Sequence, residues 1–471
     1  MRLFSKLMLV LACAANAHGT DAASPNVVLI LVDDLGYCDS ELYGCDAVPT
    51  PNIKQIAEEG ALFTDGYVSS PVCSPSRAGL LTGRYQQRFG HEYLPAMEPG
   101  SGDGLSPEEV TLADALKEAG YVTGMVGKWH LGSQEQFHPV NRGFDEFFGT
   151  VTWGTDYLDP TRKDARIVRR AGANPNAAES PRKGRGFNGL MRGTTPVEED
   201  DYLTDAFTRE AVAFINRHKS RPFFLYLPYT AVHGPLQVTQ EYYDRFPHIE
   251  DEPRRIYAGM TSALDDGVGV VVNALEENGL EQNTLVVFLS DNGGGVSDVN
   301  SNKPLRLGKQ TMFEGGVRVP FTMKWPARIP KGMVYEHPVS ALDIFPTAVA
   351  AAGGNLPTDR TIDGVDLIPY LNGSNSDVPH DKLFWRAGPI WAARVGDWKL
   401  TYAADRYWLY DLSTDIGEIN NLADKRPDVV KRIHASYAQW NAGNIEPLWP
   451  SFAAKDMPDF SVDGVTVKWT F

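Results

Sequence analysis

Four apolar runs in the N-terminal two thirds of the chain each end in polar residues, and helical patterns separate them. The runs lie at residues 26–32, 121–126, 223–227 and 285–289, while apolar side chains recur at helical spacing over 202–218 and 256–275. This alternation is typical of a mostly parallel sheet with helices on both faces. Ligands of such sheets bind beyond the carboxyl ends of the strands. We therefore expect the polar residues after the four runs to meet at one edge.

The pattern changes near residue 379 to short alternating segments rich in Trp and Tyr. Residues 390–395, 398–402 and 408–412 predict antiparallel strands, and 427–440 predict a helix. A chain of 471 residues is also too long for one simple core. We predict a large, mostly parallel mixed α/β domain at 24–378 and a smaller C-terminal α+β subdomain with an antiparallel sheet at 379–471. The aromatic side chains of the subdomain are expected to pack mostly against the main sheet.

Residues 1–17 have the pattern of a secretory signal peptide. Arg2 and Lys6 supply the charge, and residues 7–15 form an apolar core. Residues 15–17 form a small-x-small cleavage site. The apolar core is far shorter than the roughly 20 residues of a membrane span, and no later segment has the length and apolar character of one. We expect a periplasmic or secreted protein without a membrane span. A weaker cue at residues 10–13 would instead attach a lipid to Cys13.

The net charge of −16 argues against a nucleic-acid partner. Positive charge is nevertheless concentrated at residues 160–192, where nine Lys and Arg side chains stand against only Asp164 and Glu179. This insertion is either a solvated loop or a basic flap that steers an acidic polymer towards the site.

Two acidic pairs follow the first and the fourth apolar run. Asp33, Asp34, Asp291 and Asn292 form an all-oxygen set, and hard cations such as Ca²⁺ prefer oxygen ligands. Adjacent carboxylates at a strand end repel each other unless a cation neutralises them. A solvated turn would explain the first pair alone, but the second pair favours one bound Ca²⁺ ion.

Cys73 begins the segment Cys-Ser-Pro-Ser-Arg, in which Pro75 suits the first turn of a helix. The thiol would then lie near the positive end of that helix. The pattern Cys-x-Pro-x-Arg, with Leu-Thr-Gly-Arg at 81–84, resembles the maturation signature of the formylglycine-dependent type I sulfatases of the alkaline-phosphatase-like superfamily. A buried, inert cysteine before a helix is the alternative for the motif taken alone.

Two further cysteines, Cys38 and Cys45, bracket a short loop. An oxidising compartment permits a disulfide between them, and two unpaired small side chains are the alternative. Cys38 is also a departure from the resemblance, because the family has a glycine there.

The resemblance to the sulfatases covers nearly the whole chain beyond residue 24. Segments 32–37 and 290–293 resemble the family's two calcium-binding segments, and 127–130, 226–235 and 307–320 resemble further signature segments. The metal ligands that this resemblance implies are Asp33, Asp34, Cys73, Asp291 and Asn292. The catalytic residues that it implies are Cys73, Arg77, Lys128, His130, His233, Lys309 and Asp291.

The resemblance also implies a mechanism. A formylglycine-generating maturation enzyme oxidises Cys73 to the aldehyde 3-oxoalanine, and the hydrated aldehyde attacks sulfur with help from Asp291. His233 and Lys309 protonate the departing alcohol, as a general acid does. His130 then removes the proton of the second hydroxyl, and sulfate leaves. The implied Ca²⁺ acts as a Lewis acid and a template.

The function expected from these features is the removal of sulfate from a sulfated carbohydrate. The basic insertion and the signal peptide favour a polysaccharide or oligosaccharide, such as an algal galactan like carrageenan or a glycosaminoglycan. A phosphodiesterase or phosphonate monoester hydrolase of the same fold is one alternative. A non-catalytic binder of anionic glycans is another.

Overall fold

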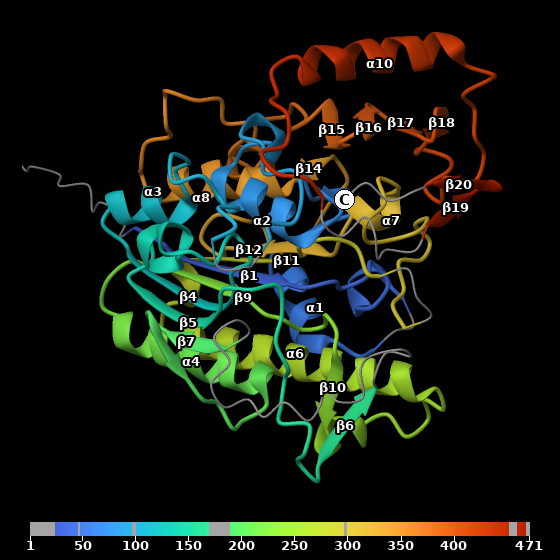
Figure 1. Cartoon of the computed structure of the whole chain (residues 1–471). Helices are drawn as coiled ribbons and strands as arrows, with labels where there is room; N and C mark the ends of the chain where they lie inside the picture. Colours follow the sequence, from blue (N-terminus) through green and yellow to red (C-terminus); the bar gives the residue numbers. More distant parts are fainter. Residues whose placement is uncertain are drawn as a thin grey trace, which may run out of the picture.

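The computed structural model describes residues 24–45, 48–96, 100–168, 189–295, 299–451 and 459–467. A ten-stranded sheet runs through the main body in the order β13-β2-β12-β11-β1-β9-β4-β5-β7-β8 (Figure 1). Its five central strands are parallel to one another: β11 (Thr284–Ser290), β1 (Asn26–Val32), β9 (Phe223–Pro228), β4 (Val122–Lys128) and β5 (Glu146–Thr150). Antiparallel neighbours on both sides make the sheet mixed. The predicted fold class is confirmed.

The flanking strands are short. They are β12 (Phe321–Lys324), β2 (Ala61–Phe63) and β13 (Met333–Tyr335) on one side, and β7 (Leu190–Arg192) and β8 (Thr195–Val197) on the other.

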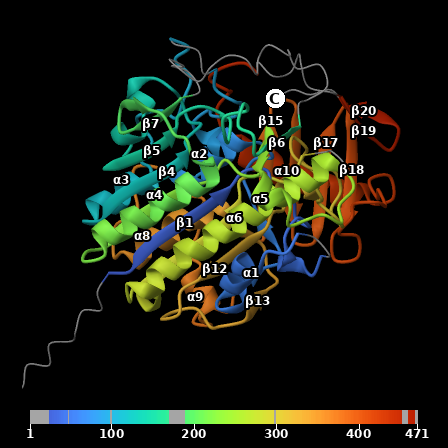
Figure 2. The ribbon, with the colours of Figure 1, turned by 90° about the horizontal axis from the view of Figure 1, so that it is seen from below.

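Both faces of the sheet are buried, and β1 shows why its sequence is apolar throughout. Val27, Leu29 and Leu31 belong to one core cluster, while the alternate residues Val28 and Ile30 belong to a second cluster across the sheet. Figures 1 and 2 show α4 (Leu203–His218) and α6 (Glu252–Glu277) lying across one face. The first cluster also contains residues of α2 (Cys73–Thr82), α3 (Leu112–Glu118) and α8 (Ile344–Ala351). The second contains residues of α1 (Pro51–Glu58), α4 and α6.

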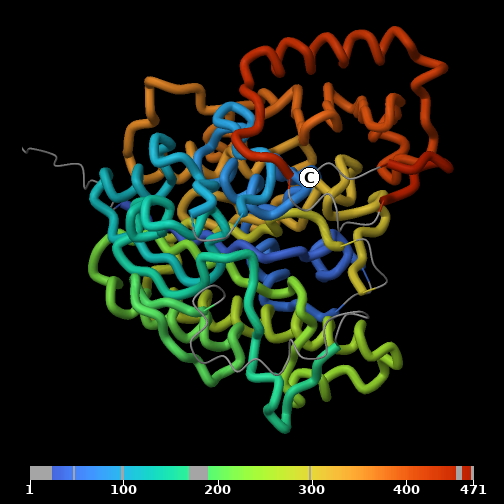
Figure 3. The backbone as a smooth tube through the Cα atoms, viewed as in Figure 1, coloured from blue at the N-terminus to red at the C-terminus, as the bar shows by residue number. Residues whose placement is uncertain are grey.

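The C-terminal part contains a separate four-stranded antiparallel sheet. Its strands are β15 (Lys382–Ala387), β16 (Ile390–Val395), β17 (Trp398–Ala403) and β18 (Arg406–Asp411), and α10 (Pro427–Asn441) lies along it. In Figure 3 this red layer lies against one side of the main body.

The aromatic residues of this layer divide between its two faces. Trp391 stacks on Tyr437 of α10, with ring centroids 3.9 Å apart, whereas Trp385 and Trp408 share a core cluster with Tyr67 of the main body. The expectation that most of them pack against the main sheet is therefore wrong, because α10 covers the other face. The boundary between 378 and 379 stays a prediction.

The remaining short elements connect these layers. They are β3 (Gly66–Tyr67), β6 (Ala165–Val168), β10 (Leu236–Thr239), α5 (Gln240–Tyr243), α7 (Glu314–Val317), β14 (Val339–Ser340), α9 (Ile368–Leu371), β19 (Phe460–Val462) and β20 (Val465–Val467).

Among the residues that the structure describes, no helix combines the length and the apolar character that a membrane crossing requires. The predicted signal peptide at 1–17 and Cys13 lie outside the described residues.

Candidate active site

The carboxyl ends of neighbouring strands bring the predicted residues together. Val32 and Ser290 are the last paired residues of β1 and β11, and the backbone N–H of Asp291 donates to the carbonyl of Val32 at 2.9 Å. Asp33 and Asp291 therefore start side by side although they are far apart in the sequence. Lys128 ends β4 at the same edge of the sheet. The expected meeting of strand-end residues is what the fold produces.

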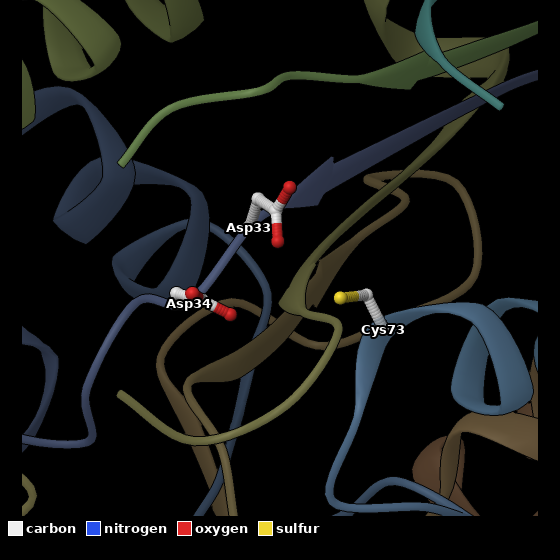
Figure 4. Close-up of side chains that lie close together, drawn as sticks. All are labelled: Asp33, Asp34 and Cys73. Atoms are coloured by element: carbon white, nitrogen blue, oxygen red, sulfur yellow. The ribbon is translucent and has the colours of Figure 1, made fainter. Parts of the chain in front are cut away.

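The acidic residues form a cluster that fits a cation (Figure 4). Donor atoms of Asp33, Asp34 and Cys73 lie within 4.8 Å of one another. The Nδ2 atom of Asn292 donates to Asp34 Oδ1 at 2.7 Å, while Oδ1 of Asn292 and Oδ1 of Asp33 are buried without a hydrogen-bond partner. Such acceptors are costly to bury unless another group satisfies them. Their oxygen chemistry suits a hard divalent cation.

Arg77 connects helix α2 to two strand ends. Its Nε and Nη2 atoms lie 2.9 and 2.8 Å from Asp291 Oδ2, and its Nη1 donates to the carbonyl of Lys128 at 2.7 Å. Both charged side chains of the Arg77–Asp291 pair are fully buried. The pair holds Cys73, which begins the same helix, against the end of β11. The role of Asp291 as a metal ligand stays a prediction.

Two lysines flank the acidic cluster. Lys128 Nζ lies 2.5 Å from Asp33 Oδ2. Lys309 Nζ lies 2.6 and 2.8 Å from the two oxygens of Asp34 and 3.5 Å from Cys73 Sγ. An anionic group bound beside Cys73 would therefore meet fixed positive charge, which is the arrangement that stabilises charge in a transition state.

The two predicted histidines have different environments. His130 is buried, with 2 % of its surface exposed, and its backbone adopts the left-handed region with φ of 62°. His233 keeps 20 % side-chain exposure, and its Nε2 lies 3.8 Å from Asp34 Oδ2. His130 is thus at the floor of the site and His233 at the solvent side.

A hydrogen-bonded pair that sequence reasoning missed supports His130. The hydroxyl of Ser74 donates to the carbonyl of His130 at 2.6 Å and lies 2.7 Å from His91 Nε2. Because the single hydroxyl proton is used on the carbonyl, His91 is the donor of the second bond. Ser74 lies inside the cysteine motif, so the motif could have marked it as a residue of the site. His91 follows 17 residues later without any pattern that marks it.

Burial sets the protonation of the site. It raises the pKa of the Cys73 thiol, against the opposing effect of the nearby lysines. It raises the pKa of Asp291 to about 6, with a further contribution from Asp33. Burial, followed by the charge of Lys128, lowers the pKa of His130 well below its usual range. A neutral imidazole accepts a proton, whereas a protonated thiol is a poor nucleophile.

The fold decides between the two alternatives for Cys38 and Cys45, a disulfide or two unpaired side chains. Cys38 and Cys45 form a disulfide with a Cα–Cα distance of 5.5 Å, and Cys73 is a free, buried cysteine.

Two of the four described basic side chains of the insertion have acidic partners nearby. Arg162 pairs with Asp164 and Arg192 pairs with Glu210, each at 2.8 Å. Strand β6 of the insertion pairs with β10, which follows His233 closely in the sequence. Arg169, Arg170, Arg182, Lys183 and Arg185 lie outside the described residues, so the predicted basic flap stays a prediction.

Comparison with known proteins assigns the family. The sulfatase family model matches residues 25–354, and the model of the C-terminal region of N-sulphoglucosamine sulphohydrolase matches 306–441. The large mixed sheet agrees with the alkaline-phosphatase-like fold of the type I sulfatases. The chain belongs to the sulfatase family, whose members hydrolyse sulfuric esters.

Individual relatives support this assignment. The chain is 36 % identical to the N-acetylgalactosamine-6-sulfatase of Canis lupus familiaris over 84 % of this chain and 74 % of the relative. It is 36 % identical to arylsulfatase A of Bos taurus over 91 % and 90 % of the two chains. Among solved structures, Ps i-CgsB superimposes with a TM-score of 0.83 at 36 % identity, covering 90 % of this chain and 94 % of that one.

A more distant likeness concerns the fold alone. The phosphonate monoester hydrolase of Agrobacterium radiobacter matches with a TM-score of 0.64 at 21 % identity, covering 89 % of this chain and 95 % of the other.

Proposed function

We propose that this protein is a secreted or periplasmic, calcium-dependent sulfatase that removes sulfate from a sulfated oligosaccharide or polysaccharide. The observation that carries the proposal is the convergence of Cys73, Lys128 and Lys309 on the acidic cluster at the strand ends. A sulfate ester seated there would place its sulfur against residue 73 and its oxygens against fixed cations. The family of the chain supports the same reaction.

The carbohydrate substrate is proposed from the relatives. Ps i-CgsB has also been solved in complex with k-i-k-neocarrahexaose, with a TM-score of 0.82 to this chain at 35 % identity, covering 90 % of this chain and 94 % of the other. Another relative is an N-acetylgalactosamine-6-sulfatase. A sulfated galactan such as carrageenan is therefore our first choice, and a glycosaminoglycan is the second.

We propose that the nucleophile is made from Cys73. A formylglycine-generating enzyme would convert the side chain to an aldehyde, and addition of water would give two hydroxyls on one carbon. Burial keeps the unmodified thiol protonated, so conversion would supply the reactivity that the native side chain lacks. Arg77, held by Asp291, would orient the new hydroxyls from the same helix.

The proposed steps divide between the two histidines. One hydroxyl attacks sulfur while Asp291 receives its proton, and His233 with Lys309 protonates the alcohol that leaves. The sulfate is then bound to the carbon of residue 73. His130 removes the proton of the second hydroxyl, the C–O bond to sulfate breaks, and the aldehyde forms again. Lys128 balances the charge of the sulfate throughout.

Asp33, Asp34, Asp291 and Asn292 would hold the Ca²⁺ ion together with residue 73. When bound, the ion supplies Lewis acidity and a fixed positive charge. The unpartnered Oδ1 atoms of Asp33 and Asn292 support this assignment.

The test is the release of sulfate from defined carrageenan and glycosaminoglycan oligosaccharides by protein that was expressed with a maturation enzyme. Peptide mass spectrometry of the segment around Cys73 measures the conversion, and Cys73→Ala is the control. We expect sulfate release that scales with the aldehyde fraction. Faster turnover of matched phosphate or phosphonate esters would favour the alternative hydrolase. Glycan binding by fully converted protein without turnover would favour a non-catalytic binder.

A further inference from the structure

The exposed side of the site shows where the body of the substrate lies. Asp33, Arg77 and Lys128 have no side-chain exposure, whereas Asp34 and Lys309 are each 14 % exposed and His233 is the most open member of the group. A sulfate ester can therefore reach the buried floor only if its alcohol part remains on the His233 side. Any group that recognises the sugar must border this opening.

Trp153 borders the opening and faces solvent. Its ring centroid lies 6.3 Å from that of His233, and 45 % of its surface is exposed. Within the described part of the chain, every other Trp, Tyr and Phe side chain is less exposed than Trp153. An indole ring exposed at the mouth of a site offers a large apolar surface, and covering it with a ligand is favourable.

The segment that carries Trp153 is fixed at both ends to the catalytic edge. At its start, the backbone N–H of His130 donates to the carbonyl of Val151 at 3.2 Å. At its end, the hydroxyl of Tyr157 contacts the carbonyls of Thr230 and of His233, the latter at 2.8 Å. The segment follows β5, which lies beside β4 in the sheet (Figure 1).

Hydrogen bonds within the segment also hold its turn. Thr150 and Thr152 share a hydrogen bond between their hydroxyls at 3.1 Å, and the hydroxyl of Thr152 donates to the carbonyl of Gly154 at 3.3 Å. Trp153 is thus presented beside His233 on a backbone that these hydrogen bonds hold in place. Such preorganisation lowers the entropy that a ligand would lose on binding.

We propose that Trp153 is the platform on which the sugar ring that carries the scissile sulfate stacks. The C–H face of a pyranose is apolar and covers an aromatic ring, while its hydroxyls and sulfate point to polar groups. His233 is proposed to protonate the departing oxygen of that sugar, so the sugar lies next to the histidine and against the indole. This inference rests on the proposed sulfatase function and adds a specificity-determining residue to it.

The test compares the wild type with Trp153→Ala, Trp153→Phe and Val270→Ala. Val270 is the matched control because it is 48 % exposed and lies on α6, away from the opening. Steady-state kinetics are measured with a sulfated monosaccharide and with a neocarrahexaose. The rates of each variant are corrected for its aldehyde content. We expect Trp153→Ala to raise KM on both substrates about tenfold, Trp153→Phe to raise it only two- to threefold, and Val270→Ala to have no effect.

Three results would overturn the inference. The first is an unchanged KM for Trp153→Ala protein whose melting temperature equals that of the wild type. The second is a loss confined to kcat, which would mean that Trp153 acts on His233 and not on the sugar. The third is an effect seen only with the hexaose, which would assign the tryptophan to a neighbouring ring.

A binding measurement separates this inference from the proposed function. Cys73→Ala protein, which cannot be converted, is titrated with the same oligosaccharides by calorimetry, with and without Trp153→Ala. If the wild type releases no sulfate, the proposed function fails. A tenfold loss of affinity on removal of the indole would still support a sugar platform, and equal affinities would refute it.

Discussion

Ser74 donates its hydroxyl proton to the backbone carbonyl of His130 at 2.6 Å, which ties the residue after Cys73 to a proposed catalytic base. The two residues are 56 positions apart and belong to different elements, α2 and the end of β4. His91 supports the hydroxyl from the other side. The bond therefore connects helix α2, which begins at Cys73, directly to His130.

Removing this hydroxyl tests the relationship. Ser74→Ala leaves the His130 carbonyl without this donor in a buried place, which costs about 1–3 kcal/mol. We expect kcat per aldehyde-containing chain to fall about tenfold with KM nearly unchanged. His91→Phe, which keeps a ring against Trp449, should have a smaller effect because the Ser74 bond remains. Full kcat in Ser74→Ala protein would show that the bond does not position His130.

Lys309 is predicted to contribute directly to turnover. Its ammonium group lies against Asp34 and the sulfur of Cys73, so Lys309→Ala removes charge where the sulfate and the leaving oxygen would be. We expect kcat to fall by about 10²–10³, the usual effect of losing one preorganised electrostatic group. The control is Lys303→Ala, because Lys303 is an exposed lysine of the same region. Wild-type rates in Lys309→Ala would remove this lysine from the mechanism.

Calcium binding is predicted to depend on Asn292. Its buried Oδ1 has no partner within the protein, so Asn292→Ala should lower the calcium content measured by elemental analysis. In the wild type, calcium at 100 times its Kd should raise the free energy of unfolding by about 2.7 kcal/mol, and the variant should lose most of this response.

A second carboxylate group supplies the control for this measurement. Glu59, Glu276 and Glu281 also lie close together, but Lys324 Nζ is 2.5 Å from Glu59 and 2.7 Å from Glu281. Because the ammonium group already occupies the space between these carboxylates, Glu59→Gln should leave calcium content unchanged. Equal calcium loss in both variants would contradict the assignment of the site.

The stability of the protein is predicted to fall at alkaline pH through His380. Burial lowers the pKa of this histidine, but the nearby carboxylates, chiefly Asp343 at 2.7 Å, together raise it by more, so the net shift is upward. The folded state therefore holds the proton more tightly than the unfolded chain, whose histidine pKa is about 6.5. The contribution is complete below pH 6.5 and is lost as the pH rises through the folded pKa.

Urea unfolding at pH 6 to 9 measures this effect. His380→Gln should be less stable than the wild type by about 2 kcal/mol at pH 6, a usual value for a hydrogen bond to a charged group. The difference should shrink at pH 9. His248→Gln, at an exposed position, is the control. A difference that does not change with pH would rule out His380 as the titrating group.

Local patterns predicted the parts of the fold that local forces determine. The run that became β1 was predicted with its observed bounds because both faces of the strand are buried and it contains no charge. Strand β15 was missed because it carries Lys382 and Arg386. Arg386 pairs with Glu92, 294 residues earlier, and no local pattern reveals so distant a partner.

The candidate site shows the same division. Strand-end position was enough to predict that Asp33 and Asp291 would meet. The support of His130 by Ser74 and His91 was not predictable, because it depends on how α2 packs against the end of β4. The sequence likewise did not single out Trp153, because its place beside His233 is set by the fold.

The burial of α2 has a consequence for the proposed conversion of Cys73. Every residue of this helix, from Cys73 to Thr82, is buried, and Arg77 is locked into its ion pair. An enzyme that reads the cysteine motif would find neither residue accessible on the finished protein. Under the proposed mechanism, conversion of Cys73 would therefore have to precede folding, and a molecule that folded first would keep its thiol.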